Sequence, residues 1–320
     1  MANYDVFNGD ADGVISLVQL RLNEPKQSYL ITGVKRDIAL LQQVRADHGD
    51  DITVLDISME KNADALTEVL DMGAYVTYID HHRAGHIPHH SSLKAHINLD
   101  ANMCTALIVD ELIEGKYHAW AIAAAYGDNL VAKADELANQ AGYTNEQMAF
   151  LKELGTLVNY NGYGSSINDL HFHPADLYQA LVKYESPFEL QNDSSSVYHA
   201  LRAAYQNDFD QLDEITPLVS NHTLGAFVLP NEPWARRVIG VFSNDLANEM
   251  PHRAHAVCRD NGDGTYTVSL RAPLNNKQGA GDVCAMFPTG GGRAAAGGVN
   301  ALPEHQLDEF MRCVERYYAS

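Results

Sequence analysis

The first hundred residues of the chain alternate short apolar runs with stretches in which apolar residues recur at helical spacing. The runs, which we expect to form buried strands, are residues 4–7, 29–32, 52–55 and 75–79. The stretches between them, which we expect to form helices, are residues 14–22, 38–46 and 63–72. Strands that alternate with single helices pair in parallel, because each helix returns the chain to the same end of the sheet. The pattern therefore predicts an α/β fold with a parallel sheet, to which residues 95–99 add a further strand.

The remainder of the chain predicts a helical extension and then a second domain. Helices are expected at residues 103–113, 118–139 and 145–159, from Pro174 onward, and at residues 194–206. The apolar periodicity weakens over residues 208–222, which we interpret as a linker. Beyond it we expect strands at residues 223–229, 238–242, 254–258 and 265–271, and a helix at residues 304–317. We thus predict a first domain of residues 1–207 and a smaller α/β domain of residues 223–320.

The composition narrows the class of function. The 320 residues are 46% hydrophobic, which is enough for a packed core, and no run of about 18 apolar residues predicts a membrane span. Four scattered cysteines without a Cys-x-x-Cys pair, and a start without a signal-peptide pattern, predict a cytoplasmic enzyme with reduced thiols. The net charge of −20 argues against binding to long duplex nucleic acid, which depends on many Lys and Arg contacts to phosphate.

The charge is also distributed unevenly. Residues 1–220 hold 13 Lys and Arg against 32 Asp and Glu, whereas residues 221–320 hold 9 against 10, and eight of those nine are arginines. An acidic region favours divalent cations, and planar arginine side chains favour phosphate. Solubility alone would also explain an acidic surface.

Acidic residues and histidines follow three of the predicted strands. Asp10 and Asp12 follow the first strand, Asp56 follows the third, and Asp80-His81-His82 follows the fourth. Ligand sites of parallel sheets lie at the carboxyl ends of strands, so we expect these side chains to converge. Crowded carboxylates repel one another, and a divalent cation removes that repulsion; carboxylate oxygens together with imidazole suit Mn²⁺. Taken singly, Asp12 would serve equally well as a helix N-cap, and the histidines as part of a solvated loop.

A glycine-rich segment in the second domain is a candidate phosphate site. The backbone N–H groups of Gly290, Gly291 and Gly292 would be accessible to an anion, and Arg293 adds a positive charge. The spacing matches neither a Walker A motif nor a Gly-x-Gly-x-x-Gly fingerprint, so a nucleoside triphosphate or dinucleotide cofactor is not expected. A flexible loop is the alternative interpretation.

These motifs, in this order, resemble those of the DHH phosphoesterases, in the subgroup with a DHH-associated C-terminal domain. The resemblance covers nearly the whole chain and is carried by Asp80-His81-His82, the Asp-x-Asp-Gly of residues 10–13, Asp56, Gly127-Asp128 and the glycine-rich residues 290–298. It implies a parallel-sheet DHH domain with a helical extension, joined across a cleft to the smaller α/β domain.

The resemblance also implies a centre of two Mn²⁺ ions. Asp56 would bridge both ions, Asp10 would hold the first, and the ligands of the second would be Asp12, His81 and Asp128. His82 would contact the scissile phosphate, and Asp80 would orient its neighbours. Such a pair of ions activates a water molecule and neutralises the phosphate during attack.

The chain departs from the family's pattern at three positions. Val6 stands where many members have a histidine, and Asn8, which we keep as a candidate ligand, stands where an exonuclease branch often has an acid. The first ion is therefore expected to bind more weakly than the second. Arg293 stands where the family usually shows a histidine; together with Arg271 and the glycines 290–292 it is implied to bind the end of the substrate away from the cut.

The expected function is that of a Mn²⁺-dependent phosphodiesterase that cuts very short linear nucleotides to mononucleotides, with pGpG, a product of cyclic di-GMP turnover, as the named substrate. The acidic surface and the lack of a basic track disfavour long polymers and membranes as partners. The alternatives are a single-strand exonuclease, a pyrophosphate or polyphosphate hydrolase, and a catalytically weak nucleotide-binding regulator. The oligomeric state is left open.

Overall fold

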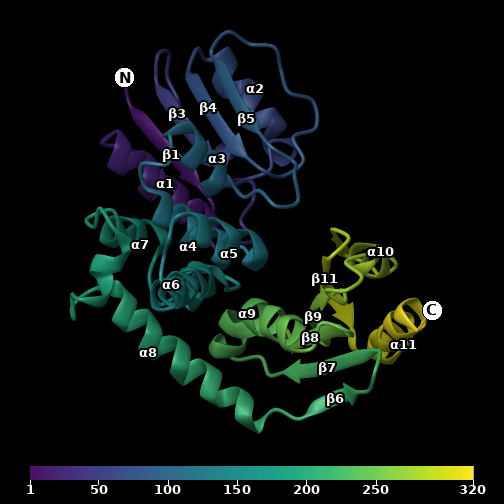
Figure 1. Ribbon diagram of the computed structural model, residues 1–320. Coiled ribbons are helices and arrows are strands. Elements are labelled where there is room, and N and C mark those ends of the chain that lie inside the picture. The colour runs from purple at the N-terminus through teal and green to yellow at the C-terminus, as the bar shows by residue number, and fades with distance from the viewer. Residues whose placement is uncertain (320) are drawn as a thin grey trace. The chain divides into compact units, whose positions relative to one another are not determined.

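The computed structural model describes residues 1–319 and divides into two compact units, Met1–Tyr205 and a second one that begins at Gln206. The first unit is built on a five-stranded sheet in the order β2-β1-β3-β4-β5, in which every neighbouring pair is parallel (Figure 1). Its strands are β1 (Asn3–Phe7), β2 (Tyr29–Ile31), β3 (Asp51–Leu55), β4 (Tyr75–Asp80) and β5 (Leu93–Ile97). The predicted α/β fold with a parallel sheet is confirmed.

Eight α-helices and four short 3₁₀-helices among the described residues begin in the first unit. The α-helices are α1 (Ala11–Asn23), α2 (Ala63–Asp71), α3 (Thr105–Leu112), α4 (His118–Gly127), α5 (Val131–Gln140), α6 (Asn145–Gly162), α7 (Pro174–Leu181) and α8 (Val197–Phe209). The 3₁₀-helices are Leu40–Gln43, Glu60–Asn62, Ile167–Asp169 and Pro187–Gln191. Pro174 lies in the first turn of α7, where its missing N–H costs no helical hydrogen bond.

Both faces of the parallel sheet are covered, because successive side chains along a strand point to opposite sides. Phe7, Leu55 and Ile79 belong to one buried core, which they share with α1, α3, α4 and α6. Val54 and Tyr78 belong to a second core, which they share with α2 and the 3₁₀-helix Leu40–Gln43. A sheet covered on both faces explains why its strands appear in the sequence as continuous apolar runs.

Two helix predictions in this unit are wrong in extent. Residues 38–46 form only the 3₁₀-helix Leu40–Gln43, and its Leu40 and Leu41 are buried against the sheet without a longer helix. Residues 118–139 form two helices, because the chain breaks at Asp128, Asn129 and Leu130, with Asn129 at a φ of 61°. The break matters because Asp128 is one of the candidate ligands.

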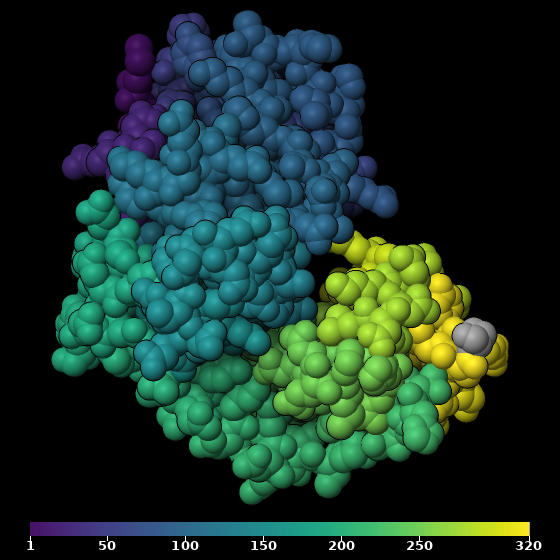
Figure 2. All heavy atoms as spheres, in the orientation of Figure 1, coloured from purple at the N-terminus to yellow at the C-terminus, as the bar shows by residue number. Residues whose placement is uncertain are grey.

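The second unit contains a six-stranded mixed sheet in the order β10-β11-β9-β8-β7-β6. Its strands are β6 (Pro217–Ser220), β7 (Leu224–Leu229), β8 (Ala254–Asp260), β9 (Thr265–Arg271), β10 (Gly290–Gly292) and β11 (Ala296–Pro303). Its helices are the 3₁₀-helices Asp210–Glu214 and Glu304–Gln306 and the α-helices α9 (Pro233–Glu249), α10 (Ala280–Ala285) and α11 (Leu307–Tyr318). α11 buries Phe310, Met311 and Val314. Figure 2 shows the yellow, C-terminal part of the chain, which includes α11, at the surface of the second unit.

The strand expected at residues 238–242 lies inside helix α9, so this prediction is wrong. The run Val-Ile-Gly-Val-Phe has the composition of a strand, but buried residues continue at helical spacing from Ala235 through Val238 and Ile239 to Leu246. The pairing of β7 with β8 supplies the physical reason, because these strands are parallel and need a crossover between them. Pro233 is the first residue of α9, a position at which proline is compatible with a helix.

Residues 208–222 do not form an extended linker. They hold the end of α8, the 3₁₀-helix Asp210–Glu214 and strand β6, which pairs with β7. Within residues 1–319 no helix has the length and apolarity required to cross a membrane.

Candidate metal centre

The acidic and histidine residues that follow the strands of the parallel sheet lie together at its carboxyl edge. β1 leads into Asp10 and Asp12, Asp56 follows β3 directly, and β4 ends at Asp80, immediately before His81 and His82. Five of these residues expose only 0–8% of their surface: Asp10, Asp12, Asp56, Asp80 and His81. So many buried carboxylates in one place need compensating positive charge.

Asp10 is the N-cap of helix α1. Its Oδ1 accepts the backbone N–H groups of Asp12 at 3.1 Å and of Gly13 at 3.2 Å, and its Oδ2 pairs with the ammonium of Lys35. Burial alone would raise the pKa of Asp10, but the charge and hydrogen bond of Lys35 outweigh it and lower this pKa to about 2. The capping role that the sequence allowed for Asp12 belongs to Asp10.

Asp12 is fixed by the beginning of helix α3. Its Oδ2 accepts the N–H of Thr105 and its Oδ1 accepts the N–H of Ala106, each at 2.7 Å. The first N–H groups of a helix have no partner within the helix, so this carboxylate satisfies two of them. Each oxygen keeps a further lone pair for another ligand.

Asp56 has a left-handed backbone, with a φ of 57°. Its N–H donates to the carbonyl of Ile79 at 3.1 Å, and the hydroxyl of Thr105 donates to its Oδ1 at 3.3 Å. Burial first, and then the charges of Asp12, Asp10 and other acidic neighbours, raise the pKa of Asp56 well above its usual value. A non-glycine residue in this conformation costs about 1 kcal/mol or more and is found most often at functional sites.

His81 directs one ring nitrogen toward three carboxylates. Its Nδ1 lies 2.9 Å from the carbonyl oxygen of Met103, which fixes the proton on Nδ1 and leaves the lone pair on Nε2. That Nε2 is 3.5 Å from Asp56 Oδ1, 3.7 Å from Asp12 Oδ2 and 4.0 Å from Asp128 Oδ2. The arrangement is typical of a histidine that is oriented to bind a metal ion.

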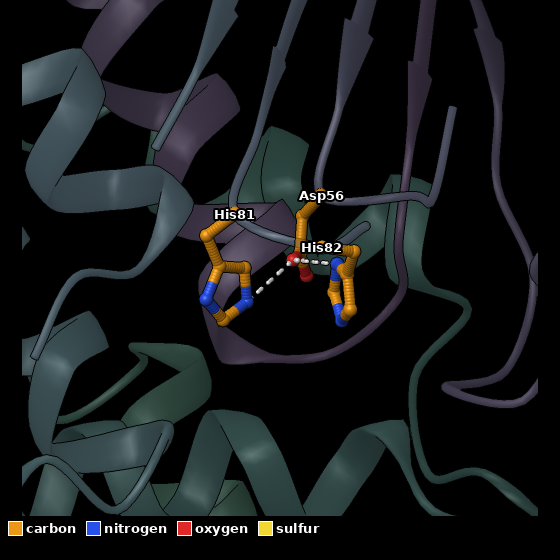
Figure 3. Close-up of side chains that lie close together, drawn as sticks. All are labelled: Asp56, His81 and His82. Carbon is orange, nitrogen blue, oxygen red and sulfur yellow. Dashed lines mark ion pairs between the residues drawn. The ribbon is translucent and has the colours of Figure 1, made fainter. Parts of the chain in front are cut away.

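His82 is oriented by Asp80. The Nδ1 of His82 donates to Asp80 Oδ1 at 2.7 Å, and the same nitrogen lies 3.7 Å from Asp56 Oδ1 (Figure 3). The other oxygen of Asp80, Oδ2, is buried without a hydrogen-bond partner among the described residues. Because Nδ1 carries the proton, Nε2 is the nitrogen that His82, with a side chain 30% exposed, can offer to a ligand.

Asp128 follows the last turn of α4, where the chain breaks before α5. Its side chain is 21% exposed, the most accessible of the clustered carboxylates. Burial raises the pKa of Asp128, and the charges of His81 and Lys35 partly offset this effect. The unpredicted break between α4 and α5 is therefore the feature that places this carboxylate.

The donor set fits a divalent cation. Ligand atoms of Asp12, His81 and Asp128 all lie within 4.8 Å of one another, and so do those of Asp56, His81 and His82. Two ligand atoms that each lie about 2.1 Å from a shared ion are about 3 Å apart when they are at right angles and about 4.2 Å apart when they are opposite. The carboxylate oxygens lie 3.5–4.0 Å from His81 Nε2, which suits a shared ion better than a hydrogen bond. Since His82 Nδ1 already donates to Asp80, the better ligand set of the two is Asp12, His81 and Asp128, with Asp56 beside it at 3.5 Å from His81 Nε2.

Asn8, a candidate ligand from the sequence, makes side-chain hydrogen bonds to the backbone of two loops. Its Oδ1 accepts the N–H of Asp10 at 3.2 Å, and its Nδ2 donates to the carbonyl of Lys35 at 3.1 Å. Both ends of the amide are thus engaged between two loops of the site. A role of Asn8 in binding a metal stays a prediction.

Lys35 is the residue of this centre that the sequence analysis missed. It follows β2 in the segment Thr32-Gly33-Val34-Lys35, and its ammonium pairs with Asp10. Although burial opposes its charge, the carboxylate of Asp10 raises the pKa of Lys35 well above its usual value. A signal was present, because β2 is also a strand of the parallel sheet and Lys35 follows it on the carboxyl side.

The candidate substrate-binding residues of the second unit are Arg271, which makes hydrogen bonds within that unit, and the segment from Gly290 to Arg293. Arg271 Nε donates to Asn244 Oδ1 at 2.8 Å, and its Nη1 donates to Ser269 Oγ at 3.0 Å. Gly290, Gly291 and Gly292 form β10 at the edge of the sheet, followed by the exposed Arg293.

Most glycines of this segment are explained by close packing. A Cβ on Gly290 would lie 1.8 Å from the carbonyl oxygen of Cys284 in α10, and Gly292 has a φ of 146°. Only at Gly291 would a Cβ meet nothing within 4 Å. The flexible-loop alternative is wrong, because the segment is a paired strand; phosphate binding there stays a prediction.

The two units together have the fold of the DHH phosphoesterases that carry an associated C-terminal domain, so the resemblance found in the sequence is confirmed for the fold. No family model matches the sequence, and no curated protein does. Solved structures do match.

RecJ of Thermus thermophilus, in complex with Mn²⁺, matches with a TM-score of 0.60 at 17% identity. The match covers 99% of this chain and 52% of RecJ, so this chain spans about half the length of that protein. PggH of Vibrio cholerae, described as a pGpG-specific phosphodiesterase, matches with a TM-score of 0.59 at 16% identity, covering 100% of this chain and 99% of PggH. An exopolyphosphatase-related protein of Bacteroides fragilis matches with a TM-score of 0.51 at 14% identity, and the match covers 99% of this chain and 92% of that protein. At these identities the likeness shows the fold.

Proposed function

We propose that this chain is a divalent-cation-dependent phosphodiesterase that hydrolyses very short linear nucleotides to mononucleotides in the cytoplasm. The observation that carries the proposal is the convergence of Asp12, Asp56 and Asp128 on the lone-pair nitrogen of His81. Carboxylate ligands together with an imidazole suit a divalent cation such as Mn²⁺ or Mg²⁺. Mn²⁺ is the named ion, because nitrogen and oxygen ligands together suit it better than Mg²⁺.

The reaction consumes one water for each phosphodiester bond. A bound divalent cation lowers the pKa of water and neutralises charge on the phosphate. The bond between phosphorus and the 3′ oxygen breaks, leaving a 3′-hydroxyl on one nucleoside and a 5′-phosphate on the other, so pGpG yields two molecules of GMP. The carboxylate cluster alone would repel such a substrate, and the reaction therefore requires the cation.

His82 and Asp80 are the residues of the chain that handle the phosphate in this proposal. Asp80 accepts the hydrogen bond of His82 Nδ1 and so fixes the orientation of the ring. The other ring nitrogen, Nε2, is the one left to contact a phosphate oxygen. In this reaction His82 contacts the scissile phosphate, and Asp80 acts as its positioning residue.

The preference for a short substrate rests on charge and on the second unit. The net charge of −20 disfavours a long polymer, and the candidate anion-binding residues of the second unit are few: Arg271, the edge strand Gly290–Gly292 and Arg293. We propose that these residues bind the end of the substrate away from the cut. The described activity of PggH makes pGpG the first dinucleotide to test.

The test uses the purified full chain with Mn²⁺ and a series of 5′-phosphorylated oligoribonucleotides from two to about twenty nucleotides. We expect the highest kcat/KM on the dinucleotide, no turnover in chelator, and a loss of at least about 1,000-fold in Asp56→Ala. Asp71→Ala removes an exposed carboxylate at the end of α2 and should behave as the parent protein does.

Two results would redirect the proposal. Equal or faster turnover of long chains would favour the alternative of a single-strand exonuclease. Release of phosphate from pyrophosphate would favour a pyrophosphate or polyphosphate hydrolase. If Asp56→Ala keeps the activity of the parent, catalysis at this centre is wrong.

A further inference from the structure

Lys35 places a permanent positive charge inside the carboxylate cluster. Its Nζ pairs with Asp10 Oδ2, lies 3.3 Å from Asn159 Oδ1 and is 5.4 Å from the centre of the Tyr163 ring. The three contacts come from the loop after β1 and from the end of α6. The ammonium is thus held from separate parts of the fold.

The backbone of Lys35 is fixed as firmly as its head group. Its N–H donates to the carbonyl of Gly162 at 2.8 Å, and its carbonyl accepts from Asn8 Nδ2 at 3.1 Å. Gly162 lies so close to the Asp10 loop that a Cβ there would be 2.8 Å from the Cα of Asp10. The end of α6 therefore holds Lys35 and Asp10 in one arrangement, and the ion pair is part of the fold.

This contact distinguishes Asp10 from the other carboxylates. Oδ1 of Asp10 accepts two backbone N–H groups, as the oxygens of Asp12 accept one each, but its Oδ2 is paired with the ammonium of Lys35. Asp12, Asp56 and Asp128 face His81 Nε2 instead, at distances that suit a shared ion.

Lys35 reduces the cationic charge that the cluster requires. One ammonium and one divalent cation supply three positive charges against the four carboxylates of Asp10, Asp12, Asp56 and Asp128, which leaves one net negative charge. A second divalent cation at Asp10 would stand directly beside the ammonium, and like charges at such a distance repel strongly where water is scarce. Val6 adds no ligand at this position, since it is fully buried in an apolar core.

We propose that Lys35 takes the place of one of the two cations, so that the centre binds a single divalent cation at Asp12, His81 and Asp128, beside Asp56. The ammonium neutralises Asp10, and, given the proposed function, the same charge attracts the substrate phosphate. The Lys35 side chain is 31% exposed, which leaves it accessible to a small anion. The departures from the family at Val6 and Asn8 are then consistent with a site that has lost its first ion.

The number of bound ions tests this inference without any substrate. Equilibrium dialysis of the full chain against Mn²⁺, followed by elemental analysis, should give one ion per chain, and the bound Mn²⁺ should show the electron paramagnetic resonance spectrum of an isolated ion. Two ions about 4 Å apart would give the spectrum of a coupled pair. Two ions per chain would overturn the inference.

Three variants locate the ion. Asp12→Asn should lose it, Asp10→Asn should keep it, and Lys35→Arg should keep the parent's stoichiometry because the charge is retained. A loss of bound Mn²⁺ in Asp10→Asn would overturn the inference, because Asp10 would then be a ligand.

These measurements separate two kinds of failure. If the wild-type chain binds no Mn²⁺, the proposed function fails along with the inference. If it binds two ions and hydrolyses the dinucleotide, the function stands and only the role of Lys35 is wrong. Because the decisive number is measured on the unaltered protein, the test does not depend on a variant that folds poorly.

Discussion

At the scale of single residues, one hydrogen bond decides which nitrogen of His82 meets a ligand. Asp80 Oδ1 accepts from His82 Nδ1 at 2.7 Å, while Asp80 itself is completely buried. A buried carboxylate holds a histidine in one tautomer and one orientation. The contact gives a prediction that distinguishes orientation from metal binding.

Replacing Asp80 by Asn keeps the shape of the side chain but removes its charge. We expect kcat for the dinucleotide to fall by about 100- to 10,000-fold with KM nearly unchanged, because an amide holds the tautomer and orientation of His82 less firmly than a carboxylate does. Steady-state kinetics and the Mn²⁺ content of the variant check this. A fall in bound Mn²⁺ would show instead that Asp80 supports the metal ligands, and Asp71→Asn serves as the exposed control.

The pKa of Asp56 predicts how the metal-free protein responds to pH. Because burial and acidic neighbours raise the pKa of Asp56, the folded chain keeps a proton that the unfolded chain, with a pKa of about 3.9, has released. The folded state therefore loses stability as pH rises from about 4 through the folded pKa. In chelator, the free energy of unfolding in urea should decrease from pH 5 to pH 8, and less so in Asp56→Asn.

Asp10 contributes with the opposite sign and outside that range. Since its pKa is lowered to about 2, its contribution is complete above about pH 4 and is lost only in stronger acid. A free energy of unfolding that stays flat from pH 5 to pH 8 in chelator would contradict the burial of an uncompensated Asp56.

Residue types and order were enough to predict that Asp10, Asp12, Asp56 and the Asp80-His81-His82 segment converge, because each follows a strand of the sheet, whereas Asp128 follows helix α4 and was predicted only from the family resemblance. Lys35 escaped prediction because its partner Asp10 is 25 residues away and the contact depends on how the end of α6 packs. The left-handed backbone of Asp56 escaped as well, since nothing in its neighbours requires it.

At the scale of elements, two glycines set the distance between α4 and α6. A Cβ on Gly155 would lie 1.9 Å from the carbonyl oxygen of Ala123 and 2.8 Å from the nitrogen of Gly127. Asp128 follows Gly127 directly, so this close contact also helps to position a candidate ligand.

Gly155→Ala should destabilise the protein by about 1–3 kcal/mol, because the clash with backbone atoms exceeds the gain of up to about 1 kcal/mol that alanine brings to a helix. Urea unfolding measures the change, and Mn²⁺ affinity should weaken as α4 shifts. Lys152→Ala on the exposed side of α6 should change stability by no more than about 0.5 kcal/mol. A Gly155→Ala protein as stable as the parent would show that α4 and α6 can separate at no cost.

Elements were predicted well where pattern and packing agree. The strands of the first unit, and α1, α2 and α6, lie within a few residues of their expected positions. α9 was not recognised because its centre has a strand-like composition, and only the parallel pairing of β7 with β8 requires a helix there. The break between α4 and α5 has no glycine or proline to mark it after Asp128.

At the scale of the whole molecule, the net charge of −20 governs the encounter with an anionic substrate. The overall field repels a dinucleotide, and salt screens that repulsion. We expect kcat/KM for the dinucleotide to rise by about two- to threefold between 50 and 200 mM NaCl, measured at saturating Mn²⁺. A steep fall instead would indicate that many phosphate contacts form, as in proteins that bind polymers.

The bonds from the start of α3 to Asp12 have a consequence for observing the protein. The amides of Thr105 and Ala106 donate to the two oxygens of this carboxylate, so any ion that withdraws electron density from Asp12 alters both bonds at once. The nuclear magnetic resonance signals of these two amides would thus show whether an ion is bound at Asp12, with nitrogen-15 as the only label required.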